Sequence, residues 1–291
     1  MSRKLIVTHH APDLDAITAT WLLKRFDSRQ YADAHIAFVN PGDTITLEEA
    51  EQFGLQLHEV THVDTGLGTF DHHQPERGGQ MICAASLVYD YLLERYPDYK
   101  HDQALAEIVS YATEIDHFQE ITWPEPDNTR YLAMIQELIR GLEFTTPNDD
   151  DAQMHFGMTC LDSLYATLTQ HFKAVEILDD PLKTYDFSTR FGPAIGIQTR
   201  NSDVIKLAQK RGAQLVITKD PKRGNVRLKA SPLSEINLEN VAAAIKKKDT
   251  KGSWYFHPSG KMLLNGSNKH RNQTASPLTL EEVITTVKDT L

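Results

Sequence analysis

Short apolar runs alternate with amphipathic segments along the first 120 residues. Apolar runs bounded by polar or turn residues predict buried strands at residues 3–9, 35–40 and 58–64. Apolar positions at helical spacing predict helices at residues 16–26, 46–54, 81–96 and 103–118. Strands that alternate with helices in this way predict an α/β domain with a doubly wound, mainly parallel sheet.

The pattern changes after the proline-containing loop at residues 122–129. Residues 130–144 and 151–178 are predicted to be helical, with no strand between them, and residues 179–193 look like a linker. The remaining elements are predicted strands at 194–199, 214–220 and 226–231, helices at 202–212 and 237–247, and a strand-like pair within 253–267. The predicted domains are residues 1–180, with a helical connector at about 129–180, and a second, smaller α/β domain at residues 186–291.

Composition is that of an ordinary globular protein, with 40% hydrophobic and 24% charged residues. No window approaches the roughly 18 apolar residues of a membrane helix, and the N-terminal segment does not resemble a signal peptide. Cys83 and Cys160 lie far apart and outside any CxxC pair. We therefore expect two core cysteines in a cytoplasmic protein rather than a disulfide framework.

The net charge of −10 is divided unevenly along the chain. Residues 1–185 contain 12 basic and 31 acidic side chains, whereas residues 186–291 contain 18 basic and 9 acidic ones, so the two parts carry −19 and +9. Bound cations could neutralise some of the acidic part, and the basic part could attract an anion. The alternative is that both parts only carry solvated surface charge.

Carboxylates and imidazoles gather at the ends of predicted elements in the first domain. They are His9, Asp13 and Asp15 after the first strand, Asp64 at the end of the third, Asp71, His72 and His73 in FDHHQ, and Asp116 at the end of a helix. Ligands of open parallel sheets bind beyond the carboxyl ends of the strands, and acids gathered there repel one another unless cations bind between them. Without thiolates, this set favours manganese, magnesium, iron(II) or cobalt. The number of carboxylates favours two ions roughly 3.5–4 Å apart, which activate a water and bind phosphoryl oxygens.

Four motifs in order resemble those of the DHH phosphoesterase superfamily. They are HHAPDLDA (9–16), VDTG (63–66), FDHH (70–73) and TEID (113–116). That superfamily includes family II inorganic pyrophosphatases, RecJ exonucleases, nanoRNases that also dephosphorylate pAp, and cyclic dinucleotide phosphodiesterases. The resemblance covers about residues 4–120 with specific motifs, and the remainder more loosely.

The resemblance implies a site with two Mn²⁺ ions, or Mg²⁺ or Co²⁺ in their place. By resemblance, the ligands are His9, Asp13 and Asp64 for one ion, and Asp15, Asp64, His72 and Asp116 for the other. His73 would contact the scissile phosphate or assist the leaving group. Asp71 would be a further ligand or would orient the others.

Two choices within the motifs depend on spacing and position. The family pattern places its histidine four residues before the first aspartate, which selects His9 over His10. Asp116 is favoured as the ligand of the last motif, with Glu114 as the alternative.

A narrower resemblance concerns residues 70–92, FDHHQPERGGQMICAASLVYDYL. They are similar to the DHH region of the melanocyte-proliferating-gene family, thought to be 3′–5′ RNA exonucleases. The first motif departs from that family, because this chain keeps the ordinary H-x3-D-x-D pattern.

The C-terminal part resembles the DHHA1 substrate domain faintly. That domain usually carries a glycine-rich loop ending in histidine, and the corresponding stretch here, NGSNKHRN (265–272), lacks the run of glycines. The candidate substrate-binding residues are His270, Arg271, Arg227, Lys229 and Arg77.

The preferred hypothesis is a metal-dependent phosphohydrolase acting on short oligoribonucleotides or small nucleotides. The alternatives are a manganese-dependent inorganic pyrophosphatase, whose usual basic signatures are not found, and a non-catalytic protein that binds or senses nucleotides. Zinc-finger spacing, RNP-type strands and a P-loop are missing from the sequence, so we expect no long duplex and no membrane as partner. The sequence leaves a homodimer open.

Overall fold

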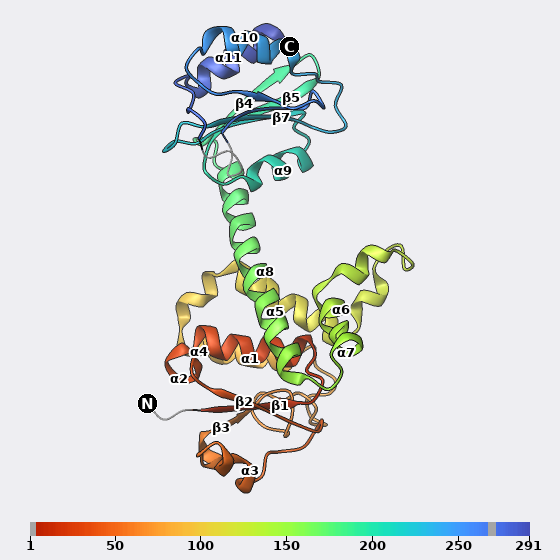
Figure 1. The fold of residues 1–291 in the computed structure, drawn as a ribbon. Coiled ribbons are helices and arrows are strands. Elements are labelled where there is room, and N and C mark those ends of the chain that lie inside the picture. The colour runs from red at the N-terminus through yellow and green to blue at the C-terminus, as the bar shows by residue number, and fades with distance from the viewer. Residues whose placement is uncertain (1–3, 267–271) are drawn as a thin grey trace. The chain divides into compact units, whose positions relative to one another are not determined.

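A computed structural model describes residues 4–266 and 272–291 of the chain. The chain divides into two compact units, Met1–Leu168 and Thr169–Leu291, and the division falls within the long helix α8 (Asp150–Asp179). Each unit has its own β-sheet and its own hydrophobic core (Figure 1). The α/β fold class predicted from the hydrophobic pattern is confirmed.

Unit 1 is built on three parallel strands in the order β2-β1-β3. These strands are β1 (Leu5–His9), β2 (His35–Val39) and β3 (Val60–His62). The helices and 3-10 turns of this unit, apart from the first part of α8, are α1 (Leu14–Phe26), α2 (Ser28–Tyr31), α3 (Leu47–Gln52), η1 (Leu57–Glu59), α4 (Ala84–Arg95), η2 (Pro97–His101), α5 (Gln103–Asp116), η3 (Gln119–Thr122), η4 (Thr129–Ala133), α6 (Ile135–Arg140) and α7 (Leu142–Thr145).

Both faces of this sheet are covered, which explains why β1 is apolar at successive positions rather than at every second one. Ile6 packs into the large core formed with α1, α4 and α5, which lie together on one side of the sheet (Figure 1). Leu5 and Val7 point to the opposite face and pack against Ile45 and Leu55, which flank α3. The sheet is therefore doubly wound, as predicted, and its carboxyl edge remains for polar residues.

The helical segment predicted at residues 130–144 is divided into η4, α6 and α7. Met134 lies between the first two in an extended conformation, with φ −83° and ψ 159°, which interrupts the helical hydrogen-bond series. The helix predicted at residues 151–178 is confirmed as α8. Met154 and Leu161 from its first part are buried in the unit 1 core.

Unit 2 contains a six-stranded sheet in the order β4-β5-β6-β7-β9-β8. Its strands are β4 (Thr184–Thr189), β5 (Gly192–Gln198), β6 (Leu215–Lys219), β7 (Val226–Ala230), β8 (Tyr255–Phe256) and β9 (Met262–Asn265), and its helices besides the end of α8 are α9 (Asp203–Lys210), α10 (Glu239–Lys248) and α11 (Leu280–Thr290). Only β5 and β6 pair in parallel, and the other neighbours are antiparallel.

The linker predicted at residues 179–193 is wrong, because this stretch contains β4 and the start of β5. Thr184–Thr189 is an edge strand with mostly exposed or half-buried side chains, so it lacks the apolar run that marks a central strand. The domain division predicted near residues 180–186 stays a prediction.

The two faces of the unit 2 sheet are covered differently. Helices α10 and α11 pack on one face, with Leu215, Ile217 and Leu228 beneath them. On the other face, α9 and the last turns of α8 cover Ile197 on β5 and Val216 on β6. On the neighbouring strand β7, this face of the sheet carries polar side chains.

Candidate metal centre

The loop after β1 supplies the first group of polar side chains. His9 is the last residue of β1, and the loop then turns through Ala11, whose φ of 49° lies in the left-handed region. Asp13 caps the N-terminus of α1, because its carboxylate accepts hydrogen bonds from the N–H groups of Asp15 and Ala16 at 3.0 and 3.1 Å. The strand end and the cap together bring His9 and Asp13 to one side of the loop, with Nε2 and Oδ1 4.0 Å apart.

Asp64 lies just after β3, in a tight connection. Its φ is 55°, and its N–H donates to the carbonyl of Phe70 at 2.9 Å, next to the bridge between Val63 and Phe70. An aspartate tolerates the left-handed region better than most side chains do. This connection therefore places the nearly fully buried Asp64 carboxylate directly beside the loop after β1.

Asp71 organises the DHH loop. Its carboxylate accepts hydrogen bonds from the N–H of Leu67 at 2.7 Å, the N–H of His73 at 3.0 Å and Nδ1 of His73 at 2.8 Å. Asp71 is completely buried and belongs to none of the candidate ligand groups among the described residues. Its position favours the orienting role over the role of a further ligand. The guanidinium of Arg77 also holds this loop, through the carbonyls of Thr69 and Asp71.

Asp15 connects the metal centre to α4. Its two carboxylate oxygens accept hydrogen bonds from the N–H groups of Ala84 and Ala85, each at 2.7 Å, in the first turn of that helix. These donors have no intrahelical partner, so Asp15 caps α4 from another part of the chain. Cys83, directly before α4, is buried next to Asp15 with its Sγ 3.3 Å from the hydroxyl of Thr113.

Asp116 and Glu114 differ in what they contact. Asp116 ends α5, and its Oδ2 lies 3.8 Å from Nδ1 of His72. Glu114 instead accepts a hydrogen bond at 2.8 Å from the indole N–H of Trp123. The structure therefore places Asp116, and not Glu114, next to the other candidate ligands.

These segments converge on one cluster around Asp64. Its Oδ2 lies 3.2 Å from Nε2 of His9, and its Oδ1 lies 3.3 Å from Nε2 of His72. Asp15 Oδ2 is 3.7 Å from the same nitrogen of His72. Three overlapping groups, each with ligand atoms within 4.8 Å of one another, are His9–Asp13–Asp64, Asp15–His72–Asp116 and Asp64–His72–His73. The first group has the same three residues as one ligand set that the motif resemblance implies, and the second has three of the four residues of the other set, without Asp64.

The close packing of acids and imidazoles shifts the pKa values of the groups in the cluster. Burial alone would lower the pKa of His9, but the carboxylates of Asp64 and Asp13 raise it to about 9. The Asp64 carboxylate, followed by those of Asp116 and Asp15, raises the pKa of His72 to about 9 against the effect of burial. Burial and the Asp64 charge raise the pKa of Asp116 to about 6, although His72 opposes this.

The pKa values of Asp15 and Asp64, two buried acids of the cluster, are shifted in opposite directions. Burial and the charges of Asp64, Asp13 and Asp116 raise the pKa of Asp15 well above its usual value. Burial also disfavours the charged form of Asp64, but the contacts with His72 and His9 outweigh it and hold the pKa of Asp64 below its usual range. Asp64 is therefore the carboxylate most firmly ionised in the cluster.

The residues present fit divalent cations. Oδ1 of Asp64 and Nε2 of His72 are buried and lack a hydrogen-bond partner among the described residues, although they face each other at 3.3 Å. Buried polar atoms are normally satisfied, and an ion is one of the partners that can satisfy them. Carboxylate oxygens with imidazole nitrogens form a donor set suited to manganese or magnesium.

Asp150 and Gln153 of α8 hold the loop between His9 and Asp13, and the sequence analysis missed both residues. Asp150 accepts hydrogen bonds from the N–H of Ala11 at 2.7 Å and from His10 at 2.6 Å. Gln153 donates to the carbonyl of Pro12 at 3.1 Å. These contacts fix the loop between His9 and Asp13, and no sequence signal indicates them because about 140 residues separate the partners.

The predicted substrate-binding residues belong to different parts of the chain. Arg77 is bound to backbone carbonyls of the DHH loop, as described above. Arg227 and Lys229 lie on β7 of unit 2. His270 and Arg271 lie outside the described residues.

Comparisons with known proteins give likenesses to solved structures at low identity. No protein-family model and no curated protein matches the chain. The crystal structure of RecJ in complex with Mg²⁺ from Thermus thermophilus has a TM-score of 0.33 and 14% identity, covering 98% of this chain and 49% of that one. Exonuclease RecJ bound to manganese has a TM-score of 0.30 and 15% identity, covering 98% of this chain and 89% of that one. An exopolyphosphatase-related protein from Bacteroides fragilis has a TM-score of 0.25 and 13% identity, covering 99% and 91%.

This chain spans about half the length of the Thermus RecJ chain. Within the described part of the chain, no helix has the length and apolar character needed to cross a membrane.

Proposed function

We propose that the chain is a DHH-superfamily phosphohydrolase that cleaves phosphoester bonds of short oligoribonucleotides or small nucleotides. The observation that carries this proposal is the convergence of four motifs, far apart in sequence, on the cluster around Asp64. A site that no longer bound metal ions would not need this many buried acids, because unpaired carboxylates held close together are unfavourable.

His9, Asp13 and Asp64 would hold one divalent cation, and Asp15, Asp64, His72 and Asp116 the other, with Mn²⁺ preferred over Mg²⁺ or Co²⁺. When bound, such ions supply an activated water and neutralise the charge of phosphoryl oxygens. Asp64 would serve both ions, since its two oxygens face His9 on one side and His72 on the other.

His73 is suited to contact the substrate. Its side chain is 60% exposed, whereas that of His72 is 14% exposed. Asp71 accepts the hydrogen bond from Nδ1 of His73, which fixes the ring and leaves Nε2 for a phosphate oxygen. A protonated His73 would deliver the Nε2 proton to the leaving-group oxygen, with the buried Asp71 carboxylate stabilising its charge.

The test is product release in Mn²⁺ buffer from pAp, a 5′-labelled diribonucleotide and pentaribonucleotide, cyclic di-AMP and pyrophosphate. We expect turnover of a nucleotide substrate, its loss in EDTA and its return with Mn²⁺. Asp64→Asn should lower turnover by at least about 100-fold, since even residues that only support metal ligands contribute 10–100-fold. Asp98→Asn is the matched control, because Asp98 is exposed on η2 and outside the cluster.

Full turnover in EDTA, or equal turnover in Asp64→Asn and the parent chain, would overturn the mechanism. Release of phosphate from pyrophosphate, without turnover of any nucleotide, would favour the pyrophosphatase branch. Nucleotide binding without turnover in Mn²⁺ would favour the sensing role.

A further inference from the structure

Residues with strained backbone conformations gather around the metal cluster. In the described part of the chain, the non-glycine residues with positive φ are Ala11, Asp64, Leu67, Phe118, Glu125 and Asn148. The first four lie within three residues of a candidate metal ligand. Strained residues persist where the surrounding structure holds them, and they are often found at functional sites. Two of the four, Leu67 and Phe118, have large apolar side chains, for which this conformation is unusual.

Leu67 and Phe118 are also exposed. Their exposed fractions are 56% and 71%, and neither residue belongs to a hydrophobic core of the described residues. Packing in a core therefore does not explain either residue. Phe118 occupies the left-handed position directly after the C-cap of α5, where glycine is the usual residue because it adopts this conformation without strain. A glycine would be favoured there if only the turn mattered.

The backbone at Phe118 is held by contacts on both sides of it. Nε2 of His117 lies 3.2 Å from the carbonyl oxygen of Gln80, and Nε2 of Gln119 donates to Sδ of Met81 at 3.8 Å. Gln80 and Met81 belong to the loop between the DHH motif and α4. The fold therefore holds Phe118 in its strained conformation directly after the last ligand motif.

Leu67 is held by the residue that organises the DHH loop. Its N–H donates to Oδ2 of Asp71 at 2.7 Å, while Oδ1 of Asp71 binds the ring of His73. Leu67 also follows Asp64, the central residue of the cluster, by three positions. Two exposed apolar side chains thus adjoin the cluster from two different segments.

The segment around Phe118 is acidic. Residues 101–129 contain seven acidic side chains and neither lysine nor arginine. Such a segment repels a further phosphate group but not an uncharged nucleobase. The exposed ring of Phe118 offers an apolar face on which a base can stack. The chemistry beside the last ligand motif therefore favours a base over an additional phosphate.

We propose that Phe118 stacks on a nucleobase of the substrate, and that Leu67 supplies a second apolar contact to the nucleoside. This role rests on the proposed function, because a phosphate bound at the cluster brings its attached nucleosides next to it. The strain at both residues then has a reason, since it holds apolar side chains in solvent where a base can cover them. The site would prefer nucleotides, whose bases can stack, over pyrophosphate, which has none.

The experiment compares a 5′-phosphorylated diribonucleotide with an analogue in which hydrogen replaces both bases. The measured quantity is kcat/KM of the full chain in Mn²⁺ buffer. We expect the parent chain to favour the base-containing probe by at least about tenfold, as is typical of stacking between a base and an aromatic side chain. Phe118→Gly should remove most of this preference. Phe118→Trp should keep it, because the indole ring also stacks.

Phe118→Gly also separates stacking from stability. Because glycine adopts the left-handed conformation without strain, this variant should not unfold at a lower temperature than the parent chain in differential scanning calorimetry. Leu67→Gly should reduce the preference for bases by a smaller factor, since an aliphatic side chain cannot stack.

Phe53→Ala is the matched control. Phe53 is another exposed phenylalanine of unit 1, but it ends α3 and packs on His35, the first residue of β2. It therefore lies at the amino edge of the parallel sheet, whereas the metal cluster lies at the carboxyl edge. Phe53→Ala should leave the preference for bases within about threefold of the parent value.

Four results would overturn the stacking role: equal kcat/KM for the two probes, a preference retained in Phe118→Gly, an equal loss in Phe53→Ala, or a lower unfolding temperature of Phe118→Gly. Cleavage of both probes at equal rates would leave the proposed function intact. If neither probe is cleaved, the proposed function fails, and isothermal titration of both probes in Mn²⁺ buffer decides the stacking role. Tighter binding of the base-containing probe, lost in Phe118→Gly, would support it, and equal binding would overturn it.

Discussion

The carboxylates in and near the cluster differ in whether they already accept hydrogen bonds from other groups of the fold. Asp71 satisfies three N–H groups of its own loop, and Glu114 accepts the indole N–H of Trp123. Oδ1 of Asp64, in contrast, has no hydrogen-bond partner among the described residues. The Asp64 oxygen is therefore better able to bind a cation than the Asp71 and Glu114 carboxylates are. The same criterion does not separate Asp15 from supporting residues, because both of its oxygens accept N–H groups of α4.

Asp116 and Glu114 allow a direct test of this criterion, since they lie two residues apart at the end of α5. Asp116→Asn should weaken binding of the second Mn²⁺ by about 10–100-fold, because a neutral amide replaces a charged ligand. Glu114→Gln should leave Mn²⁺ affinity within about threefold, since an amide oxygen can still accept from Trp123. Isothermal titration with Mn²⁺ gives the affinity and the number of ions for both variants.

Equal losses of Mn²⁺ affinity in the two variants would show that the assignment of Asp116 as the ligand of the last motif is wrong. Loss only in Glu114→Gln would transfer the ligand role to Glu114.

The residues that were predictable from the sequence are those whose chemistry is unusual for their position. Charged and imidazole groups at the ends of apolar strands, such as His9 and Asp64, are costly to bury without a reason, so they are visible in the pattern. Asp150 and Gln153 carry no such signal, because they begin an ordinary polar helix. Their role depends on a contact across about 140 residues, which only the folded chain reveals.

At the scale of elements, the first turn of α8 supports the loop between β1 and α1. Asp150 accepts two hydrogen bonds from this loop, and one donor is Ala11, whose backbone is in the left-handed region. A left-handed alanine is unfavourable and needs such support. Asp150 is thus a positioning residue for His9 and Asp13.

Asp150→Ala should weaken Mn²⁺ binding by about tenfold or more, as is typical when a residue that supports metal ligands is lost. Asp150→Asn keeps an oxygen acceptor for the Ala11 N–H, so its loss of Mn²⁺ affinity should be smaller. Asp151→Ala, at the next and exposed position, should have little effect. The measurement is Mn²⁺ affinity by isothermal titration, with thermal unfolding without metal as the check on stability.

An unchanged Mn²⁺ affinity in Asp150→Ala would show that the loop keeps its conformation without this contact.

The elements with the most buried side chains were the easiest to predict, because burial requires apolar residues that are visible in the sequence. Strands β1 and β6 are buried on both faces and appear as continuous apolar runs. Edge strand β4 buries little, so its sequence resembles a linker. Met134, an extended residue with no distinctive side-chain chemistry, separates η4 from α6, and Gly141 separates α6 from α7.

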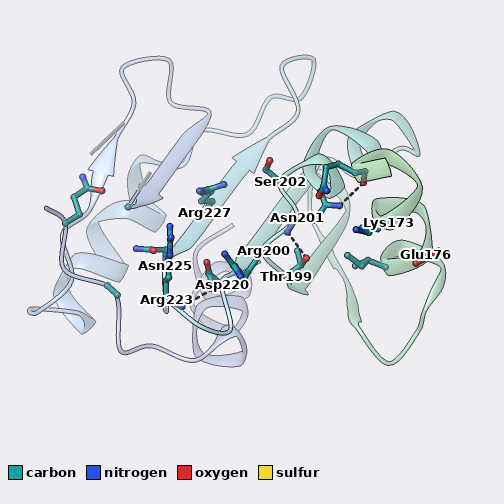
Figure 2. Close-up of a pocket in the computed structure, with 15 residues that line it drawn as sticks. Lys173, Glu176, Thr199, Arg200, Asn201, Ser202, Asp220, Arg223, Asn225 and Arg227 are labelled. Atoms are coloured by element: carbon teal, nitrogen blue, oxygen red, sulfur yellow. Dashed lines mark hydrogen bonds between the residues drawn. The ribbon is translucent and has the colours of Figure 1, made fainter. Parts of the chain in front are cut away.

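At the scale of the whole molecule, the uneven charge of the sequence corresponds to different local environments. The acidic first part contains the buried carboxylates around Asp64, and the basic second part contains a cavity whose lining includes Arg200, Arg223 and Arg227 (Figure 2). Charge composition therefore indicated that acidic and basic side chains gather in different parts of the chain, but it could not identify which of them share a site. Arg200 and Arg223 lie in loops, and their shared cavity follows from the strand order of unit 2.

The cluster also makes the stability of the whole chain depend on pH and metal together. The pKa values of His9 and His72 are raised to about 9 in the metal-free protein, so the stability that these groups contribute is complete below their unfolded value near 6.5 and is lost as the pH rises through about 9. Mn²⁺ requires the neutral imidazoles, so below pH 9 it must displace these protons, and its apparent affinity should rise with pH. Each proton displaced makes binding up to about tenfold tighter per pH unit in this window.

We therefore expect the increase in unfolding temperature caused by a fixed Mn²⁺ concentration to be larger at pH 8 than at pH 6.5. Differential scanning calorimetry of the full chain at both pH values measures this, and a hundredfold excess over the dissociation constant corresponds to about 2.7 kcal/mol of stabilisation. The metal-free protein should show the opposite trend, with a lower unfolding temperature at pH 8. Asp64→Asn should show almost no Mn²⁺ effect at either pH. A Mn²⁺ effect that is equal at both pH values would show that His9 and His72 do not exchange protons for metal, and an effect retained in Asp64→Asn would place the ion elsewhere in the chain.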